Sequence, residues 1–372
     1  MLSRVAESVY WMNRQIERAE NVARAVETTL GLVLEGTISP GRLWSALVCT
    51  FGDEADFWAR YGLADQANVI SFLAIDQANA NSIASCLQAA RENARTVRDM
   101  ISTAMWQEIN KAHLAVRAAA AANVEIEHPR EFLEEVKRAS QLISGVADAT
   151  MSHGEAWHFA RLGRLVERAD KTSRVLDVEH YFQPAAVPLA RPASGAAAFG
   201  SGPGAEIAAW NQPAAVPLAR PASGAGGDGD GDAVRWSAVL ESASALEMYR
   251  KVHGAISRRR VADFLIFDRE FPRAMHFCLI KAEESLLAIT GGAKGAYSNP
   301  AEQLLGRLRS HLNYGAIDEI LGAEPGLHGF IDSFQSRLNE ASDAIYATFF
   351  ALRPVGGGEP APAAAAGSAR RP

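Results

Sequence analysis

Cysteine is scarce in this sequence, and the patterns in which cysteine usually carries function are missing. Only three cysteines occur among 372 residues, Cys49, Cys86 and Cys278, and they form no Cys-x-x-Cys pair. This number and spacing exclude a disulfide framework and a zinc knuckle. We therefore expect a protein of a reducing compartment.

Positive charge and long apolar runs are lacking as well. The formal charge is −6, whereas proteins that coat nucleic acid usually present a basic surface. No apolar run approaches the roughly 18 residues that a membrane span needs. Arg4, Glu7 and Arg14 interrupt the first residues before a secretory signal could form. The sequence predicts a cytoplasmic protein that binds neither nucleic acid nor a membrane.

Catalytic and metal-binding motifs are also absent or weak. His-Glu-x-x-His, Gly-x-Ser-x-Gly and the phosphate-binding loop do not occur. Glu-x-x-His occurs at Glu125/His128 and Glu155/His158, and a di-iron bundle uses two such motifs with two further glutamates. Pro129, however, disfavours helix at the residue before it. We expect no metal and no cofactor.

Helical periodicity fills most of the chain, and no convincing alternating strand occurs. Between residues 1 and 35, apolar residues recur three and four positions apart, as on one face of an α-helix. The same period recurs at 66–122, 129–148, 155–182, 236–257, 261–291, 300–312 and 326–352. The predicted fold class is all-α, a large helical bundle.

Two segments are too rich in Pro, Ala and Gly to build a core. Residues 183–196 read QPAAVPLARPASGA, and residues 212–225 repeat the same fourteen letters. We expect 183–235 to be a flexible low-complexity insertion and 353–372 to be a disordered tail.

The remaining chain contains an internal match that indicates a duplication. Residues 14–27, RQIERAENVARAVE, match residues 164–177, RLVERADKTSRVLD, at an offset of 150. Further along, WSALV from Trp44 matches WSAVL from Trp236, and Cys86 matches Cys278, at an offset of 192. One insertion at the low-complexity segment explains the change of offset.

The match divides the chain into two helical units. We expect a first unit at 1–125, a connecting helix at 126–150, and a second unit formed by 151–182 and 236–352. Two such copies usually pack about a pseudo-twofold axis, as the halves of a homodimer do.

Charged residues recur in both copies and define the candidate site, which we call the Arg/Glu face. Tyr10 and Trp11 lie on the same helix face, and large aromatic rings beside arginines fit a partly buried surface. The face consists of Arg14, Glu17, Arg18 and Arg24 in the first copy, and of Arg164, Glu167, Arg168 and Arg174 in the second.

Three interpretations of this face are open. The residues can form a solvated surface laced with weak ion pairs, a buried lattice that fixes the two halves in register, or a pocket that offers guanidinium groups to a carboxylate. A second charged segment, Arg91, Glu92, Asn93 and Arg95, is either an exposed face or a second wall of the same site.

These motifs together resemble the bacterial alpha-E family, which is all-helical and named for a Glu-Arg motif. The resemblance rests on IERAENVAR and VERADKTSR, on AARENARTVRD at 89–99 and on FPRAMHFCL at 271–279. It covers nearly the whole chain except the insertion and the tail. One departure is local, because an Asn-Pro pair is expected where Asn79-Ala80 stands.

The resemblance implies an association with circularly permuted ATP-grasp ligases, transglutaminase-like proteases and amide-bond chemistry. We therefore expect an accessory protein that binds such a ligase, or a carboxylate or peptide ligand, through the Arg/Glu face. The alternatives are an enzyme in amide-bond chemistry that uses Glu17 or Glu167 as a general base, and a purely structural lattice. The location of the two Glu-Arg pairs decides between them, since a ligand site needs an open pocket.

Overall fold

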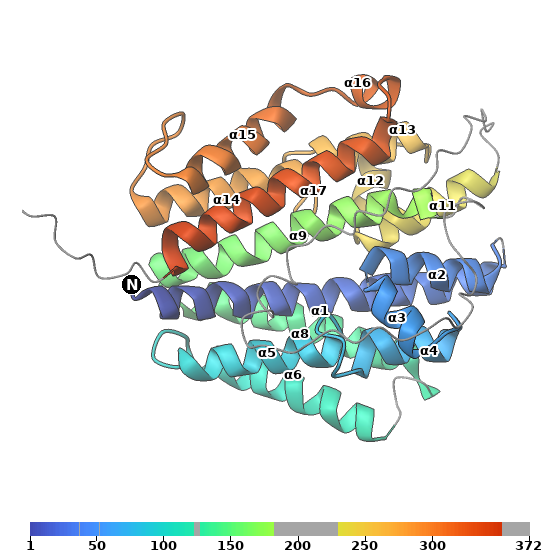
Figure 1. Ribbon diagram of the computed structural model, residues 1–372, viewed down its shortest axis with the longest axis horizontal. Helices are drawn as coiled ribbons and strands as arrows, with labels where there is room; N and C mark the ends of the chain where they lie inside the picture. The colour runs from blue at the N-terminus through green and yellow to red at the C-terminus, as the bar shows by residue number, and fades with distance from the viewer. Residues whose placement is uncertain (37, 52, 123–126, 182–229, 352–372) are drawn as a thin grey trace, which may run out of the picture.

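The protein is built around two long helices that lie side by side. The computed structural model describes residues 1–36, 38–51, 53–122, 127–181 and 230–351. Helix α1 (Ser3–Glu35) and helix α9 (Glu155–Tyr181) run through the middle of the molecule and share its most extensive helix–helix contact. Figure 1 shows the other long helices arranged on either side of this pair.

Each central helix is covered by helices that follow it in the chain. On the α1 side lie α5 (Ile83–Thr96), α6 (Thr103–Ala121) and α8 (Pro129–Thr150). On the α9 side lie α14 (Met275–Thr290), α15 (Pro300–Tyr314) and α17 (Gly326–Ile345) (Figure 1).

Shorter elements complete the bundle. These are α2 (Pro40–Phe51), α3 (Glu54–Arg60), α4 (Gln66–Ile70), η1 (Ser71–Ile75), α11 (Asp230–Ser242), α12 (Leu246–Val252), α13 (Arg258–Phe267), α16 (Ile317–Gly322) and η2 (Tyr346–Phe350). The described residues form no β-strand, which confirms the all-α prediction. None of the described helices is both long enough and apolar enough to cross a membrane.

One apolar core joins the two sides of the bundle. Buried side chains of α1, α5 and α8 belong to the same cluster as buried side chains of α9, α14 and α17. The backbones of α1 and α9 lie close together at Gly163, where a Cβ atom would lie 2.4 Å from the carbonyl oxygen of Tyr10. Only glycine allows this approach, and it brings the polar faces of the two helices within reach of each other.

Several helix boundaries differ from the sequence expectation. The segment 66–122 is not one helix, since breaks follow Ile75 and Thr96. The carboxylate of Asp76 accepts the amide of Ala78 after η1, and that of Asp268 accepts the amides of Glu270 and Phe271 after α13. Such local side-chain bonds replace helix hydrogen bonds and end the helices.

Two other expectations need correction at their edges. The helices α2 and α3 lie in residues 40–60, where no helical period was assigned. Residues 230–235, expected to be part of the flexible insertion, begin α11 instead. The rest of that insertion, together with the tail 353–372, lies outside the described residues.

Trp44 and Trp236, which match at the offset of 192, are both buried in the core, with exposed fractions of 2% and 1%. Replacing either by alanine is expected to lower the free energy of unfolding by roughly 3–5 kcal/mol, because a large cavity remains. The measurement is urea denaturation. Tyr314→Ala is the control, because that side chain is 88% exposed. Losses near zero for both tryptophans would contradict their role as core anchors.

Candidate functional site: a buried arginine–glutamate lattice

The two Glu-Arg pairs meet at the contact between α1 and α9 and pair reciprocally. Arg18 donates from Nε to Glu167 Oε1 at 2.6 Å and from Nη2 to Oε2 at 3.0 Å. Arg168 donates in the same two-pronged way to Glu17, at 2.8 Å for both bonds. The Glu17 and Glu167 side chains are 1% and 0% exposed. Each helix thus supplies the cations that the other helix's glutamate needs.

Further groups complete the bonding of each glutamate. Glu167 also accepts from Arg14 Nε at 2.9 Å and lies 3.6 Å from Lys171 Nζ. The guanidinium of Arg14 stacks over the ring of Trp11, 4.9 Å from its centroid. Glu17 also accepts from Asn21 Nδ2 at 3.0 Å. Neither carboxylate is left free to act on another molecule.

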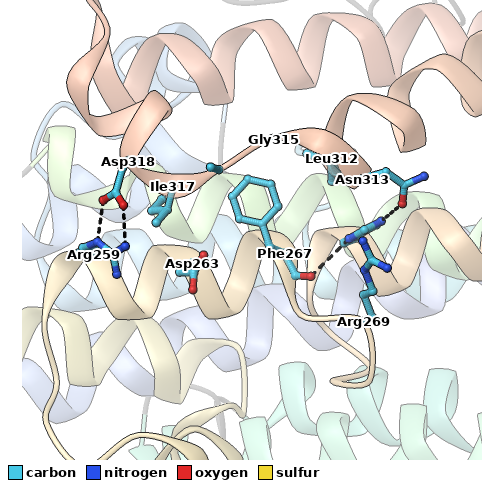
Figure 2. A pocket seen from close by; sticks show the side chains of 11 residues that line it. Arg259, Asp263, Phe267, Arg269, Leu312, Asn313, Gly315, Ile317 and Asp318 are labelled. Atoms are coloured by element: carbon cyan, nitrogen blue, oxygen red, sulfur yellow. Dashed lines mark hydrogen bonds and ion pairs between the residues drawn. The ribbon is translucent and has the colours of Figure 1, made fainter.

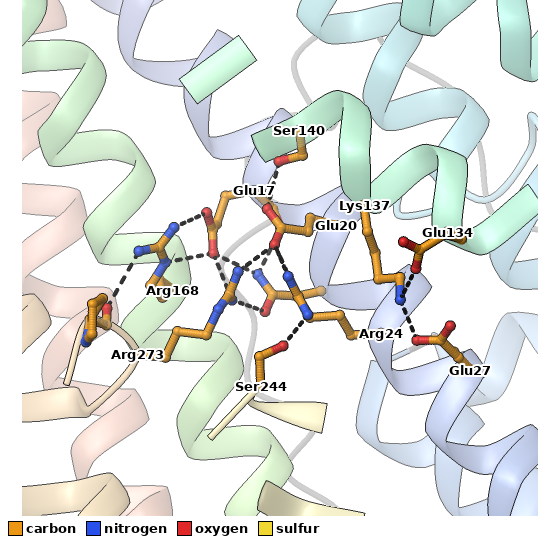
Figure 3. Close-up of polar contacts among 12 residues, drawn as sticks. Glu17, Glu20, Arg24, Glu27, Glu134, Lys137, Ser140, Arg168, Ser244 and Arg273 are labelled. Carbon is orange, nitrogen blue, oxygen red and sulfur yellow. Dashed lines mark hydrogen bonds and ion pairs between the residues drawn. The ribbon is translucent and has the colours of Figure 1, made fainter. Parts of the chain in front are cut away.

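An arginine outside both motifs joins the same cluster. Arg273 lies between α13 and α14 and donates to Glu17 at 3.2 Å and to Asn21 Oδ1 at 3.0 Å. It also bonds Glu20, which accepts from Ser140 of α8 at 2.6 Å. Figure 3 shows these groups converging between the helices. Sequence reasoning quoted Arg273 in FPRAMHFCL but did not assign it to the site.

The outer edge of the cluster lies further along both helices. Arg24 binds Glu20, and its guanidinium also contacts Ser244 (Figure 3). Arg174 donates to Asp170 at 3.0 Å, and Lys171 lies 3.1 Å from the same carboxylate. We call the whole set the Arg–Glu lattice. It consists of Arg14, Glu17, Arg18, Glu20, Asn21, Arg24, Glu167, Arg168, Asp170, Lys171, Arg174 and Arg273.

Arg164 is the one member of the predicted face that stays outside the lattice. It is half-buried and makes no hydrogen bond or ion pair within the described part of the chain. Burial and the nearby Arg168 lower its pKa. Its counterpart Arg14 binds Glu167, whereas Arg273 takes the corresponding place at Glu17. The two halves of the lattice are therefore similar but not identical.

The expected second wall does not reach the lattice. Arg91 bonds Glu92 and donates to Asn110 of α6 at 2.8 Å, and Arg95 pairs with Glu92 at 2.7 Å. Asn93 offers its backbone carbonyl to Thr96. Among the described residues, the hydrogen bonds and ion pairs of these four residues join them to one another, to α6 and to their own helix. These contacts fit the interpretation of the four residues as a partly exposed charged face.

The lattice contains more cations than carboxylates. Its cationic members are Arg14, Arg18, Arg24, Arg168, Lys171, Arg174 and Arg273, and its carboxylates are Glu17, Glu20, Glu167 and Asp170. Burial raises the pKa of Glu17, but Arg168 and Arg273 outweigh it, so the pKa lies below its ordinary value. Arg18, Arg14 and Lys171 likewise outweigh burial and hold the pKa of Glu167 well below its ordinary value.

These pKa shifts decide against proton transfer by the lattice glutamates. A general base works best when its pKa lies near the operating pH, and both carboxylates are shifted away from neutrality. The buried cysteines are unsuited to nucleophilic catalysis, because burial raises the pKa of Cys86 and Cys278 to about 12. Each thiol lies near the carbonyl of the residue six positions earlier, Ala80 or Pro272.

A cluster that sequence reasoning missed joins α9 to α17. His328 Nδ1 lies 2.8 Å from Asp177 Oδ1, and its Nε2 lies 3.5 Å from Asp332 Oδ2. The hydrogen bond with Asp177 raises the pKa of His328 against the effect of burial. One ligand atom from each residue lies within 4.8 Å of the others, a spacing that can hold a metal ion. The i,i+4 spacing of His328 and Asp332 was the available sequence signal.

Comparison with known proteins identifies one family. The model of the Alpha-E family, described as a predicted alpha-helical domain with a conserved ER motif, matches residues 1–350. That match includes both Glu-Arg pairs of the lattice. No curated protein and no solved structure matches the chain.

Removing one lattice carboxylate should be far more damaging than removing a surface carboxylate. Glu17→Gln and Glu167→Gln are each expected to cost roughly 3–5 kcal/mol, because buried guanidinium groups lose their counter-charge. The double variant should not be additive, since both residues belong to one network. Chemical denaturation measures all three variants. Glu92→Gln is the control, and its partly exposed pairs predict a loss below about 1 kcal/mol. Losses for Glu17→Gln and Glu167→Gln as small as that of the control would mean that the lattice contributes little to stability.

The depressed pKa values of Glu17 and Glu167 also predict a specific response to acid. Unfolded glutamates bind protons near their ordinary pKa of about 4.3, whereas the folded lattice still excludes them. The stability that the lattice provides is present above that pH and is lost as the pH falls toward the folded pKa values. Unfolding free energies measured between pH 6 and pH 3 should therefore fall more steeply in the wild type than in Glu167→Gln. Equal slopes would contradict the assignment.

Proposed function

The chain belongs to the Alpha-E family, and on that premise we propose that it is an accessory helical protein that acts with an ATP-grasp-type amide or peptide ligase. In this proposal the Arg–Glu lattice is a structural element rather than the binding surface. The observation that supports this choice is the burial of Glu17 and Glu167, each of which accepts two bonds from an arginine of the opposite helix and further bonds from neighbouring groups. A ligand could reach them only if α1 and α9 separated.

The proposal departs from the expectation that the Arg/Glu face binds the ligase or a carboxylate directly. Most of the face is turned inward, so the surface that meets a partner lies elsewhere. The enzymatic alternative is also disfavoured, because the cations around Glu17 and Glu167 hold their pKa values low. The circularly permuted ATP-grasp protein remains the proposed partner on the strength of the family resemblance.

We further propose that the two halves of the bundle derive from one duplicated helical unit. Three kinds of observation support this. The pairs Arg18–Glu167 and Arg168–Glu17 exchange under the offset of 150. Under the offset of 192, the two cysteine contacts and the two buried tryptophans exchange as well. In this proposal a pseudo-twofold axis between α1 and α9 relates the two sets of contacts, and the insertion accounts for the change of offset.

Copurification with the circularly permuted ATP-grasp protein tests the proposed partnership. We expect a complex, and we expect ATP consumption by the ligase with its substrates to change when this chain is added. We expect no amide formation by this chain alone with ATP, because it carries no activated base or nucleophile among its lattice residues.

The opposite results would count against the proposal in distinguishable ways. Absence of a complex together with unchanged ATP consumption would remove the ligase partnership. Amide formation by this chain alone, abolished by a folded Glu167→Gln variant, would instead establish the enzymatic alternative.

A further inference from the structure

A cleft remote from the lattice carries charges that the protein leaves unbalanced. It lies between α13, the end of α15 and α16, and its volume is about 300 Å³, within the range of small-molecule sites. Figure 2 shows Phe267 in the middle of the cleft, with Asp263 on one side and Arg269 on the other. Gly315 packs against the Phe267 ring and leaves the ring face uncrowded by a side chain at that position.

One end of the cleft has an excess of negative charge. Arg259 donates from Nε and Nη2 to the carboxylate of Asp318, through bonds of 2.6 and 2.7 Å (Figure 2). Asp263 is half-buried and has no hydrogen bond or ion pair with any residue that the structure describes. Burial raises its pKa, against the weaker influence of Arg259. This carboxylate therefore lacks a matching cation.

The other end has an excess of positive charge. Arg269 is exposed and, within the described ranges, has neither a hydrogen bond nor an ion pair. His276 lies beside it with both ring nitrogens engaged, at 3.2 Å from the carbonyl oxygen of Phe267 and 2.7 Å from Asn313 Oδ1. Burial lowers the pKa of His276, which disfavours a charge on the ring. The guanidinium of Arg269 is thus available to an anion.

The charged residues that α13 and the segment after it contribute to the cleft have no charged counterparts at the offset of 192. At the offset of 192, Asp263, Phe267 and Arg269 correspond to Ser71, Ile75 and Gln77. Arg259 and His276 both correspond to alanine, at Ala67 and Ala84. Asp268 and Cys278, which end the helix and fill the core, are retained as Asp76 and Cys86. The cleft residues differ where the structural residues agree, as expected if a binding site arose in one copy.

We propose that this cleft binds a small zwitterion whose ammonium group pairs with Asp263 and whose carboxylate pairs with Arg269, with an apolar middle over Phe267. Asp263 lies in α13 and Arg269 lies two residues beyond its end, so about 6 Å of helix and two further non-helical residues separate them along the chain. An extended chain covers about 3.4 Å per residue. A peptide of two or three residues with free termini therefore fits the spacing better than a single amino acid.

The test uses trialanine as the probe and the full-length protein. Isothermal titration should detect trialanine binding, whereas N-acetyl-trialanine, trialanine amide and free alanine should each bind at least about tenfold more weakly. Asp263→Asn and Arg269→Gln should each lower the affinity for trialanine by about tenfold or more, because each loses a charge-assisted contact. Arg337→Gln, which alters the neighbouring cleft of Arg307, His311 and Tyr314, is the matched control and should keep the wild-type affinity.

Three results would overturn the proposal. The first is that trialanine does not bind at a concentration of about 20 mM. The second is that the capped peptides bind as tightly as trialanine. The third is that Asp263→Asn and Arg269→Gln both keep the wild-type affinity for trialanine. Equal binding of 5-aminovalerate and trialanine would support the zwitterion but remove the requirement for peptide bonds. Since Asp263 and Arg269 are outside the core, circular dichroism melts should show that both variants are folded. The result is independent of the ligase partnership, because no ligase is present.

Discussion

The requirement that buried charges be paired governs the architecture of this protein. Carboxylates and guanidinium groups taken out of water are tolerated only when they bond to each other. At the contact of α1 with α9, the cations of one helix are placed against the glutamate of the other. Gly163 permits the close approach that these bonds require. The surrounding helices then pack around a central pair whose register is already determined by the bonds.

The bonds of the lattice differ between its α1 side and its α9 side. Arg18 donates to Asn81. Arg273, which corresponds to Asn81 at the offset of 192, instead donates to Glu17 and Glu20. As a result Arg14 is bound to a glutamate and Arg164 is not. An apolar interface tolerates sliding more readily than one in which each guanidinium has a particular acceptor. The charged residues therefore specify one arrangement, which is a role that buried polar groups have in some proteins.

The sequence predicted the class of fold and the members of the lattice better than it predicted their environment. Apolar periodicity identified the long helices α1 and α9, and the repeated Glu-Arg pattern identified Glu17, Arg18, Glu167 and Arg168. A charged helix face looks the same whether water or another helix covers it, so the Glu-Arg pattern alone left the burial of these residues open. Only the neighbouring Tyr10 and Trp11 favoured a partly buried surface. The place of Arg273 in the lattice depends on contacts between distant segments, which a helical period does not record.

The short segment between α13 and α14 links the lattice to the cleft. Asp268 begins it by binding the amides of Glu270 and Phe271, which fixes its path. Arg269 lies on the cleft side, and Arg273, four residues later, is buried in the lattice. A binding group is positioned well only when the chain that carries it is rigid. The bonds of Arg273 to Glu17, Glu20 and Asn21 supply that rigidity from within the bundle. The same buried lattice that joins the two halves thereby holds in place the segment on which the second half presents its charged cleft.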